Sequence, residues 1–235
     1  MNISPPMPLV VDDELALLQS LVCLRDLEII ELGCGKAELA RRLVATCPGC
    51  RVAALEVDTR QHAKNLEEPV ADIAFVRAGA QEIPFEAGRF DLALMLKSLH
   101  HVSPHLLDKA FGEVGRVLKP GGLLYLSEPV FAGDLNEVIR LFHDEQEVRR
   151  AAYVAIQRAL ESGDWESGGE TRFDTPVEFR DFADFERRVV NVTFADHRLD
   201  EPTRSQVRRR FEAHMGASGA HFMRPMRVNL LRKRQ

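Results

Sequence analysis

Apolar and polar positions alternate along the first half of the chain in a pattern that predicts strands and helices in strict succession. Short apolar runs predict strands, and longer stretches with apolar residues every three or four positions predict helices. Glycine, proline and aspartate separate the two kinds of segment, as turn residues do. The expected strands are Leu27–Leu32, Arg51–Val57, Asp72–Val76, Phe90–Leu96 and Leu123–Ser127. The expected helices are Asp12–Leu24, Ala37–Thr46, Thr59–Glu67 and Pro104–Leu118.

Strands joined in this way by helices predict an α/β fold, with a parallel sheet and helices on both of its faces. Right-handed crossovers between parallel strands place a ligand crevice at the carboxyl ends of the strands. Residues that bind or react are therefore expected just after each strand.

The alternation ends after Ser127. One long helical pattern, Gly133–Ser162, leads into a glycine-containing loop, and about 50 residues separate the fifth and sixth expected strands, more than one crossover needs. The surplus predicts a helical lid over the crevice, and its phenylalanines are interpreted as packing residues rather than a substrate cage. The remaining expected elements are a short helix at Pro176–Phe185, a strand at Arg188–Phe194, a helix at Pro202–Met215 and a last strand at Phe222–Leu231.

The composition is that of a globular domain, because 45% of the 235 residues are hydrophobic and 29% are charged. This length fits a single α/β domain. No apolar run approaches the roughly 20 residues that cross a bilayer, and residues 1–11 lack the pattern of a signal peptide. We therefore expect a cytoplasmic protein without a membrane partner.

Charge is distributed unevenly: the net charge is −5, yet residues 203–235 carry +8 and residues 1–202 carry −13. A basic segment can contact phosphates, although a solvated helix face is the more common explanation. Between Asp134 and Asp184, in the expected lid, acids outnumber arginines more than two to one. An acidic lid repels a nucleic-acid backbone, so a nucleic-acid partner is not favoured.

Four cysteines, Cys23, Cys34, Cys47 and Cys50, are too few for a disulfide scaffold in a chain of this length. Cys47 and Cys50 have the spacing of a redox pair or of half a zinc site, but no second pair of thiols or histidines stands at matching spacing. They also follow a helix, whereas a thioredoxin-like pair begins one. We interpret the residues between them as a turn and expect no metal site.

The most informative motif is Glu31-Leu32-Gly33-Cys34-Gly35, where an expected strand leads through a Gly-x-Gly turn into a helix. Glycine allows a sharp turn and close contact between a ligand and the backbone. A dinucleotide-binding motif would have a third glycine at position 38, which is Glu38 here. This acid at a helix N-terminus disfavours the pyrophosphate of NAD but not a phosphate-free ligand.

This motif and four later segments resemble the class I S-adenosylmethionine-dependent methyltransferases, most closely their ubiquinone-biosynthesis-like (type 11) branch. The motif resembles Glu/Asp-x-Gly-x-Gly-x-Gly, with Ala37 in place of the third glycine. The later segments follow in register: Glu56 after the second strand, the loop Ala80–Phe85, the segments Phe90–Leu92 and Leu99–Val102, and the turn Arg116–Gly122.

The resemblance implies a Rossmann-like fold: a seven-stranded, mostly parallel sheet with an antiparallel last strand and a helical lid inserted after strand five. It implies one methyltransferase domain over residues 1–235. The expected parts are an N-terminal helix (1–26), a cofactor-binding half (27–128), the lid (129–187) and the C-terminal strands and helix (188–235).

The resemblance also implies which residues bind the cofactor. Glu56 is expected to hold the ribose hydroxyls and Glu31 to face the ligand, although a carboxylate at position 31 can also cap a helix. Gly79 replaces an acid that contacts the adenine in many members, which leaves Gln81 and the Ala80 backbone for this role. The expected set is Glu31, Gly33, Cys34, Gly35, Glu56, Val57, Ala80, Gln81 and Leu96, and Ala37 is expected to have a negative φ.

The implied reaction moves a methyl group from S-adenosylmethionine to a nucleophile by in-line displacement, for which alignment and exclusion of water matter most. A base is needed only for a protonated nucleophile, and the candidates are His101 and His100, followed by His143, Glu128 and His221. The expected acceptor is a small molecule, with the methylated atom left open. The alternatives are an RNA-modifying enzyme that uses the basic C-terminal segment and a non-catalytic nucleoside-binding module.

Overall fold

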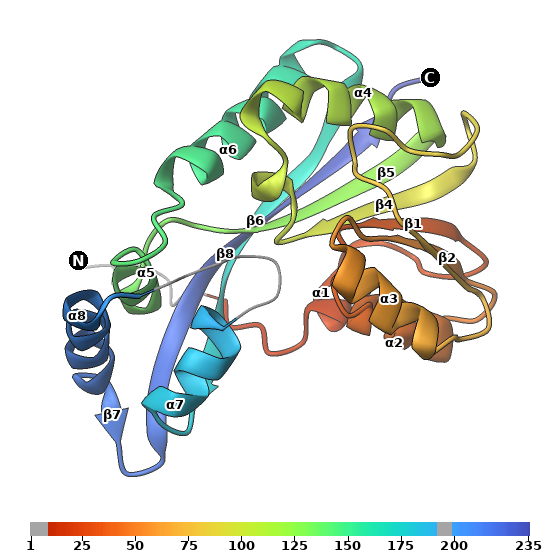
Figure 1. Ribbon diagram of the computed structural model, residues 1–235. Helices are drawn as coiled ribbons and strands as arrows, with labels where there is room; N and C mark the ends of the chain where they lie inside the picture. Colours follow the sequence, from red (N-terminus) through yellow and green to blue (C-terminus); the bar gives the residue numbers. More distant parts are fainter. Residues whose placement is uncertain (1–8, 192–198) are drawn as a thin grey trace, which may run out of the picture. The chain divides into compact units, whose positions relative to one another are not determined.

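The computed structural model of the protein describes residues 9–191 and 199–235 (Figure 1). Within these ranges, one sheet has the strand order β3-β2-β1-β4-β5-β8-β6, and the short β7 pairs with β8. The strands are β1 (Glu28–Leu32), β2 (Arg51–Leu55), β3 (Ile73–Val76), β4 (Phe90–Leu96), β5 (Leu118–Pro129), β6 (Trp165–Phe179), β7 (Met215–Gly216) and β8 (Gly219–Lys233). The α-helices are α1 (Glu14–Leu21), α2 (Glu38–Thr46), α3 (Thr59–Glu67), α4 (Leu107–Val117), α5 (Asp134–Ile139), α6 (Gln146–Glu161), α7 (Phe182–Phe185) and α8 (Glu201–Glu212).

Contacts divide the chain into two compact units. The larger unit comprises Leu15–Glu128, Gln146–Glu170 and Val228–Gln235. The smaller unit comprises Pro129–Glu145 and Thr171–Arg227, together with the described residues before Leu15. Strands β6 and β8 each pass from one unit into the other. The single domain over residues 1–235 stays a prediction, and so does the closure of residues 129–187 as a lid.

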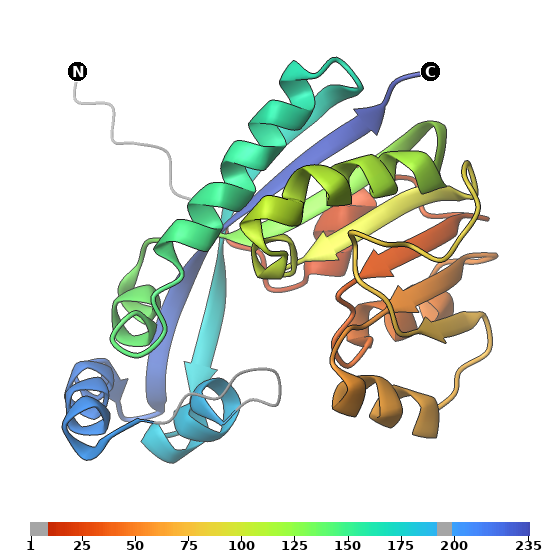
Figure 2. The same cartoon turned by 45° about the horizontal axis from the view of Figure 1, so that its top comes forward.

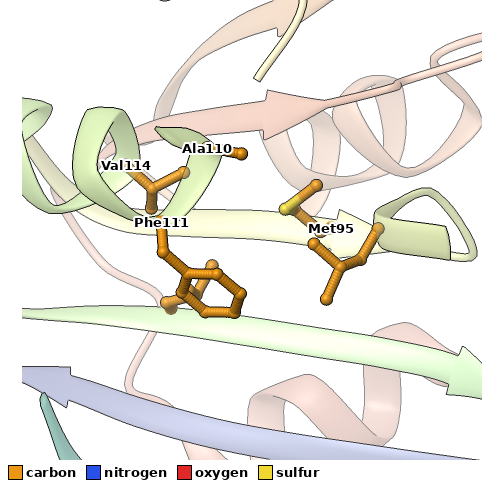
Figure 3. A pocket seen from close by; sticks show the side chains of 6 residues that line it. Met95, Ala110, Phe111 and Val114 are labelled. Carbon is orange, nitrogen blue, oxygen red and sulfur yellow. The ribbon is translucent and has the colours of Figure 1, made fainter. Parts of the chain in front are cut away.

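Strands β1 to β5 in the larger unit pair in parallel, as the succession of strands and helices predicts. Helices cover both faces of this part of the sheet, with α4 and α6 on one side and α1, α2 and α3 on the other (Figures 1 and 2). Strand β8 runs in the opposite direction to β5 (Figure 3). The predicted mostly parallel, Rossmann-like α/β fold with an antiparallel last strand is therefore confirmed.

The core of the larger unit lies between α4 and the middle strands. Met95 of β4 and Ala110, Phe111 and Val114 of α4 surround a small apolar gap (Figure 3). The gap has no room for a water molecule, so it is a feature of core packing and not a ligand site.

The smaller unit has a core of its own, which is rich in phenylalanine. The rings of Phe185 and Phe211 lie 5.0 Å apart between centroids, and Phe179 packs edge-on against Phe185. Such aromatic pairs add about 0.5–1.5 kcal/mol beyond the burial of their area. The interpretation of Phe179, Phe182 and Phe185 as packing residues is confirmed.

The single helix expected over Gly133–Ser162 is wrong, because α5 and α6 divide this range. Helix α5 buries Leu135 in the core of the smaller unit, whereas α6 buries Ile156 in the core of the larger unit. One straight helix cannot bury its apolar side chains in two separate cores, so the helix is interrupted at residues 140–145.

Strand β6 occupies residues that were expected to form a loop and the first part of a short helix, so the expectation is wrong there, whereas α7 confirms the last part of that helix. Phe173 and Phe179 stand at odd positions between polar neighbours, and Val177 falls in the same period-two pattern, which is that of a strand. The glycines that suggested a loop have another role. A Cβ on Gly168 would lie 3.1 Å from Leu230 of β8, so this glycine marks a close approach of two strands.

The strand expected at Arg188–Phe194 is wrong in its first part, because Glu186–Val190 forms a π-helical turn. Arg187 and Arg188 lie three and four residues after the buried Asp184, and both contact its carboxylate. These contacts require helical spacing, and they favour the turn over a strand. Residues 192–194 lie outside the described part of the chain.

Candidate functional site

The expected site residues that follow β1, β2 and β4 all belong to the larger unit. Because these strands are parallel neighbours, their carboxyl ends lie at one edge of the sheet. Glu31 and Gly33 stand at the end of β1, Glu56 and the exposed Val57 follow β2, and Leu96 is the last residue of β4. The structure thus brings together most of the residues that the sequence suggests for the cofactor.

The backbone N–H groups of the Gly-x-Gly turn donate hydrogen bonds to other groups of the protein. Gly33 and Cys34 both donate to the Leu55 carbonyl at 2.9 Å, and Gly35 donates to the Glu56 carboxylate at 2.8 Å. A phosphate-binding turn instead directs such N–H groups at its ligand. This arrangement agrees with a ligand that lacks a phosphate at the turn.

The two glycines of the turn have different reasons to be glycine. A Cβ on Gly33, which has a φ of +74°, would lie 2.7 Å from the Cβ of Ser98. A Cβ on Gly35, which has a φ of +53°, would have no atom of the described residues within 4 Å apart from those of its chain neighbours. Gly33 is therefore set by packing, whereas Gly35 leaves a bare stretch of backbone in front of which a ligand fits.

Ala37 has a φ of +55°, so the expectation of a negative φ is wrong. It is the N-cap of α2, which begins one residue later than expected, and its side chain is buried. A left-handed conformation costs an alanine roughly 1–2 kcal/mol. Three left-handed residues at alternate positions, Gly33, Gly35 and Ala37, therefore turn the chain from β1 into α2.

Glu31 takes one of the two roles considered for it, that of a helix cap, and its role in facing a ligand stays a prediction. A hydrogen bond from the Ala40 backbone makes it a cap for the first turn of α2, but its Oε2 is buried and has no hydrogen-bond partner among the described residues. Burial raises the pKa of Glu31 to about 8, with the hydrogen bond opposing the rise and the charge of Glu56 adding to it. A buried carboxyl group with one unsatisfied oxygen is suited to a cationic or hydrogen-bond-donating ligand.

Cys34 lies beside the two carboxylates. Burial raises the pKa of its thiol, and the charges of Glu31 and Glu56 add to the rise. The thiol is therefore protonated at neutral pH and is not a nucleophile.

Glu56 holds the glycine turn from the end of β2. Its Oε2 accepts the Gly35 N–H, and its Oε1 accepts the Asp58 N–H at 2.8 Å. Asp58 in turn caps α3 by accepting the Arg60 N–H, as expected of an aspartate at this position. The Glu56 carboxylate is thus oriented before any ligand is present.

Asn65 of α3 was not suggested by the sequence, yet it contacts the same turn. Its side-chain amide donates to the Gly35 carbonyl at 2.8 Å and approaches the Cys34 Sγ at 3.8 Å. No periodic pattern singles out one polar residue on a polar helix, so only the tertiary contact identifies it.

The loop Ala80–Phe85 is held by α4. The Ile83 N–H donates to Glu113 at 2.9 Å, and Arg116 donates to the Ile83 and Phe85 carbonyls. The hydrogen bond from Arg116 lowers the pKa of Glu113 to about 2, so the pair stays ionised over the physiological range. The buried Ala80 at the start of this loop is therefore held in a defined place.

The Gln81 amide occupies the space that a side chain at position 79 would fill. A Cβ on Gly79 would lie 2.5 Å from its Oε1 and 2.7 Å from its Nε2. The missing acid at position 79 and the presence of Gln81 are thus parts of one local arrangement.

His100 and His101 lie in the 3-10 helix η1 (Leu99–His101) after β4. His100 is buried, and its Nδ1 contacts the Oε2 of Glu128 on β5. The other oxygen of Glu128 accepts the N–H groups of Ser98 and Leu99 at 3.0 and 2.9 Å. His101 is exposed, and its ring lies 4.1 Å from that of His100 between centroids.

The two remaining histidine candidates, His143 and His221, belong to the smaller unit. His143 lies 3.0 Å from the Glu145 carboxylate, and His221 lies 2.9 Å from the Ser218 hydroxyl. The larger unit alone therefore supplies His100, His101 and Glu128 to the strand ends described above.

Cys47 and Cys50 flank a turn, as expected. Both are buried and unbridged, and Gly49 between them has a φ of +72°. A Cβ on Gly49 would collide with the Asp26 side chain. The turn thus packs against the segment that leads into β1, at the opposite end of the strand from Gly33.

Comparison with known proteins finds a family whose model matches the part of the chain that contains this site. Residues 29–122 match the model of a family described as a methyltransferase domain. This part of the chain is a methyltransferase domain. The match covers the glycine turn, Glu56, the Ala80–Phe85 loop and the η1 helix, which are the parts that make up the strand-end site.

The methyltransferase domain is also found in similar proteins. A ubiquinone/menaquinone biosynthesis C-methyltransferase from Psychromonas ingrahamii is 39% identical over 75 residues, which are 32% of this chain and 28% of that protein. The chain spans less than two thirds of the length of the curated relatives that it matches.

Solved structures share the fold over nearly the whole chain. A SAM-dependent methyltransferase from Methanosarcina mazei has a TM-score of 0.59 at 16% identity, covering 95% of this chain and 99% of that one. A phosphoethanolamine N-methyltransferase from Haemonchus contortus, in complex with S-adenosylhomocysteine, has a TM-score of 0.59 at 16% identity, covering 94% of this chain and 52% of that one. At this identity the likeness establishes the fold alone.

Proposed function

We propose that this chain is an S-adenosylmethionine-dependent methyltransferase that acts on a small-molecule acceptor. The observation that carries the proposal is the unsatisfied, buried Oε2 of Glu31 beside a glycine turn whose N–H groups at Gly33, Cys34 and Gly35 already have partners. Such a site favours a ligand that brings hydrogen-bond donors or positive charge and no phosphate. A nucleoside with an attached amino acid and a sulfonium fits this description.

The chain's own residues have distinct tasks in this proposal. When bound, S-adenosylmethionine supplies an electrophilic methyl group. Gly35 leaves room for it against the backbone, Glu56 and Glu31 bind its hydroxyl and amino groups, and Gln81 with the Ala80 backbone borders the base. Together these residues orient the donor so that a nucleophile can approach in line.

His101 is the proposed base for an acceptor that arrives protonated. His100 is committed to Glu128 and, with it, holds the first turn after β4. His101 is exposed at the same strand ends, and its ring packs at a tilt against the ring of His100. A histidine so placed suits proton transfer from a hydroxyl or ammonium group.

The contacts that basic residues of the C-terminal segment make within the protein favour a small-molecule acceptor over RNA. Among the described residues, Arg204 pairs with Glu186, and Arg234 pairs with Glu166. Lys233 donates to the Leu118 carbonyl at 2.7 Å. Arg204, Lys233 and Arg234 therefore have partners within the protein, which leaves fewer cations of the basic C-terminal segment to contact a phosphate backbone.

Isothermal titration with S-adenosylmethionine, S-adenosylhomocysteine and NAD tests the proposal. We expect wild-type protein to bind both sulfur nucleosides and not NAD. Glu56→Gln removes the charge at constant shape and should weaken binding roughly tenfold or more, since it removes charge-assisted hydrogen bonds. Glu67→Gln, on the exposed side of α3, is the matched control and should bind as wild type does.

Two results would contradict the proposal. Tight binding of NAD without binding of either sulfur nucleoside would show a dinucleotide site. Binding of S-adenosylmethionine without formation of S-adenosylhomocysteine, over a panel of alcohols, amines, acids and quinols, would show a nucleoside-binding module instead of an enzyme.

A further inference from the structure

Asn65 has an unusual environment for a polar residue. In α3, all of which is described, it is the one buried residue, with 3% of its surface exposed. A helix on a sheet normally buries an apolar side chain at such a position. Burial of an amide costs about 1–3 kcal/mol unless hydrogen bonds compensate, so the contacts of Asn65 are the reason to examine it.

The hydrogen bond that Asn65 donates leads to the glycine turn, and the one that it accepts comes from its own helix. The Asn65 Nδ2 donates to the Gly35 carbonyl at 2.8 Å, and the Asn65 Oδ1 accepts from Gln61 Nε2 at 2.9 Å. Glu56 accepts the N–H of Gly35. Side chains from the end of β2 and from α3 therefore hold both polar groups of one residue, Gly35.

The hydrogen bond from Asn65 is not needed merely to satisfy a backbone group. Gly35 is only half-buried, and a built Cβ there meets no protein atom within 4 Å, so water can reach this residue. The Asn65 amide instead restricts the backbone conformation of Gly35. Glycine samples both signs of φ readily, and a carbonyl fixed by Asn65 opposite an N–H fixed by Glu56 keeps Gly35 at its φ of +53°.

We propose that Asn65 is a positioning residue, which fixes the Gly35 peptide in the conformation that receives the methyl donor. The inference rests on the proposed function and adds to it a residue that does not itself contact the donor. When the turn already has its bound conformation, binding of the donor does not have to pay the entropy cost of ordering the turn. Asn65 therefore affects the affinity for the donor and not the methyl transfer step.

Asn65→Leu is the informative variant. Leucine has nearly the same shape, cannot hydrogen-bond, and is a better helix former than asparagine. We expect the affinity for S-adenosylhomocysteine to fall roughly three- to tenfold, the fold-change that corresponds to one lost hydrogen bond. The KM for S-adenosylmethionine should rise by a similar factor with kcat within about twofold, while the melting temperature stays the same or rises.

Two further variants complete the experiment. Asn65→Asp keeps the acceptor for Gln61 but loses the donor, so it should weaken binding at least as much as Asn65→Leu. Lys64→Gln, on the neighbouring exposed position, is the control and should bind as wild type does. In the absence of ligand, hydrogen exchange of the peptide covering residues 33–37 should be faster in both Asn65 variants than in the control.

The outcomes separate this inference from the proposed function. If wild-type protein binds neither nucleoside, both are overturned. If wild-type protein binds and both Asn65 variants bind equally well, only the positioning role is overturned. A lower melting temperature in Asn65→Leu together with wild-type affinity in Asn65→Asp would also overturn it, because Asn65 would then serve stability alone.

Discussion

Glu128 of β5 binds the imidazole of His100, and the same carboxylate accepts the backbone N–H groups at the start of η1. Both side chains are buried, with about 4% of each exposed. One carboxylate thereby ties the end of β5 to the first turn after β4, and the exposed His101 is the last residue of this turn. The position of the proposed base is therefore set by a pair of residues that lies beneath it.

Glu128→Ala should be strongly destabilising. It leaves two buried backbone N–H groups and one buried imidazole without their acceptor, at about 1–3 kcal/mol for each group. We expect the free energy of unfolding to fall by roughly 3 kcal/mol or more in a denaturant titration. A loss below about 1 kcal/mol would show that the pair does not organise this turn.

His101→Ala, in contrast to Glu128→Ala, should lower activity and leave stability almost unchanged. An exposed side chain contributes little to stability, so the free energy of unfolding should stay within about 0.5 kcal/mol of wild type. The kcat should fall about 100-fold or more with an acceptor that carries a proton, which is the usual contribution of a general base. The KM for the methyl donor should not change. Full activity in His101→Ala would exclude it as the base.

Glu31 should make stability depend on pH. Its folded pKa of about 8 lies above the ordinary value of 4.5, so the unfolded chain loses this proton first as pH rises. The destabilisation is absent below about pH 4.5, grows as pH rises towards 8, and amounts to roughly 3 kcal/mol at pH 7. Glu31→Gln should therefore raise the melting temperature at pH 7–8 and leave it almost unchanged near pH 4. An equal effect at both pH values would contradict the raised pKa.

Ala37 offers a test of the turn's backbone conformation. Glycine at this position removes the strain of a positive φ but loses a buried methyl group and adds freedom to the unfolded chain, so Ala37→Gly should change stability by less than about 1 kcal/mol. Ala37→Val puts a β-branched side chain at the same φ and should cost more than about 2 kcal/mol. Similar melting temperatures for the two variants would argue against a left-handed Ala37.

The choice between acceptors is open to a direct measurement with total tRNA. We expect binding in a filter assay to be weak at two salt concentrations, and no weaker when Arg208, Arg209 and Arg210 are replaced together by glutamine. Arg208 already lies against Phe182 and near Glu212, which limits its use as a phosphate ligand. Micromolar, salt-dependent binding that the triple variant abolishes would favour RNA modification.

The first half of the fold follows from local patterns. β4 and α3 have the bounds that were expected from the sequence, and β1, β2 and α2 differ by one or two residues at an end. Here the apolar runs of β1, β2 and β4 are buried within the larger unit, and turn residues separate the runs, so period and composition suffice. In the second half, α5 and α6 divide between two cores, and β6 pairs with β8, whose first residue lies 40 positions after the last residue of β6. A short stretch of sequence shows neither which core a helix joins nor which strand pairs with β6.

The sequence by itself determined the Gly-x-Gly turn after the first strand, the acids Glu31 and Glu56 that accompany it, and the α/β class, because these depend on residue type and short spacing. Only the tertiary structure decided how they are used. It assigned the N–H of Gly35 to Glu56 and its carbonyl to Asn65, left one oxygen of Glu31 unsatisfied, and placed Ala37 in a left-handed conformation. The hydrogen-bond partners of Gly35 are 21 and 30 residues away in the sequence, and they approach the turn only when the sheet has formed.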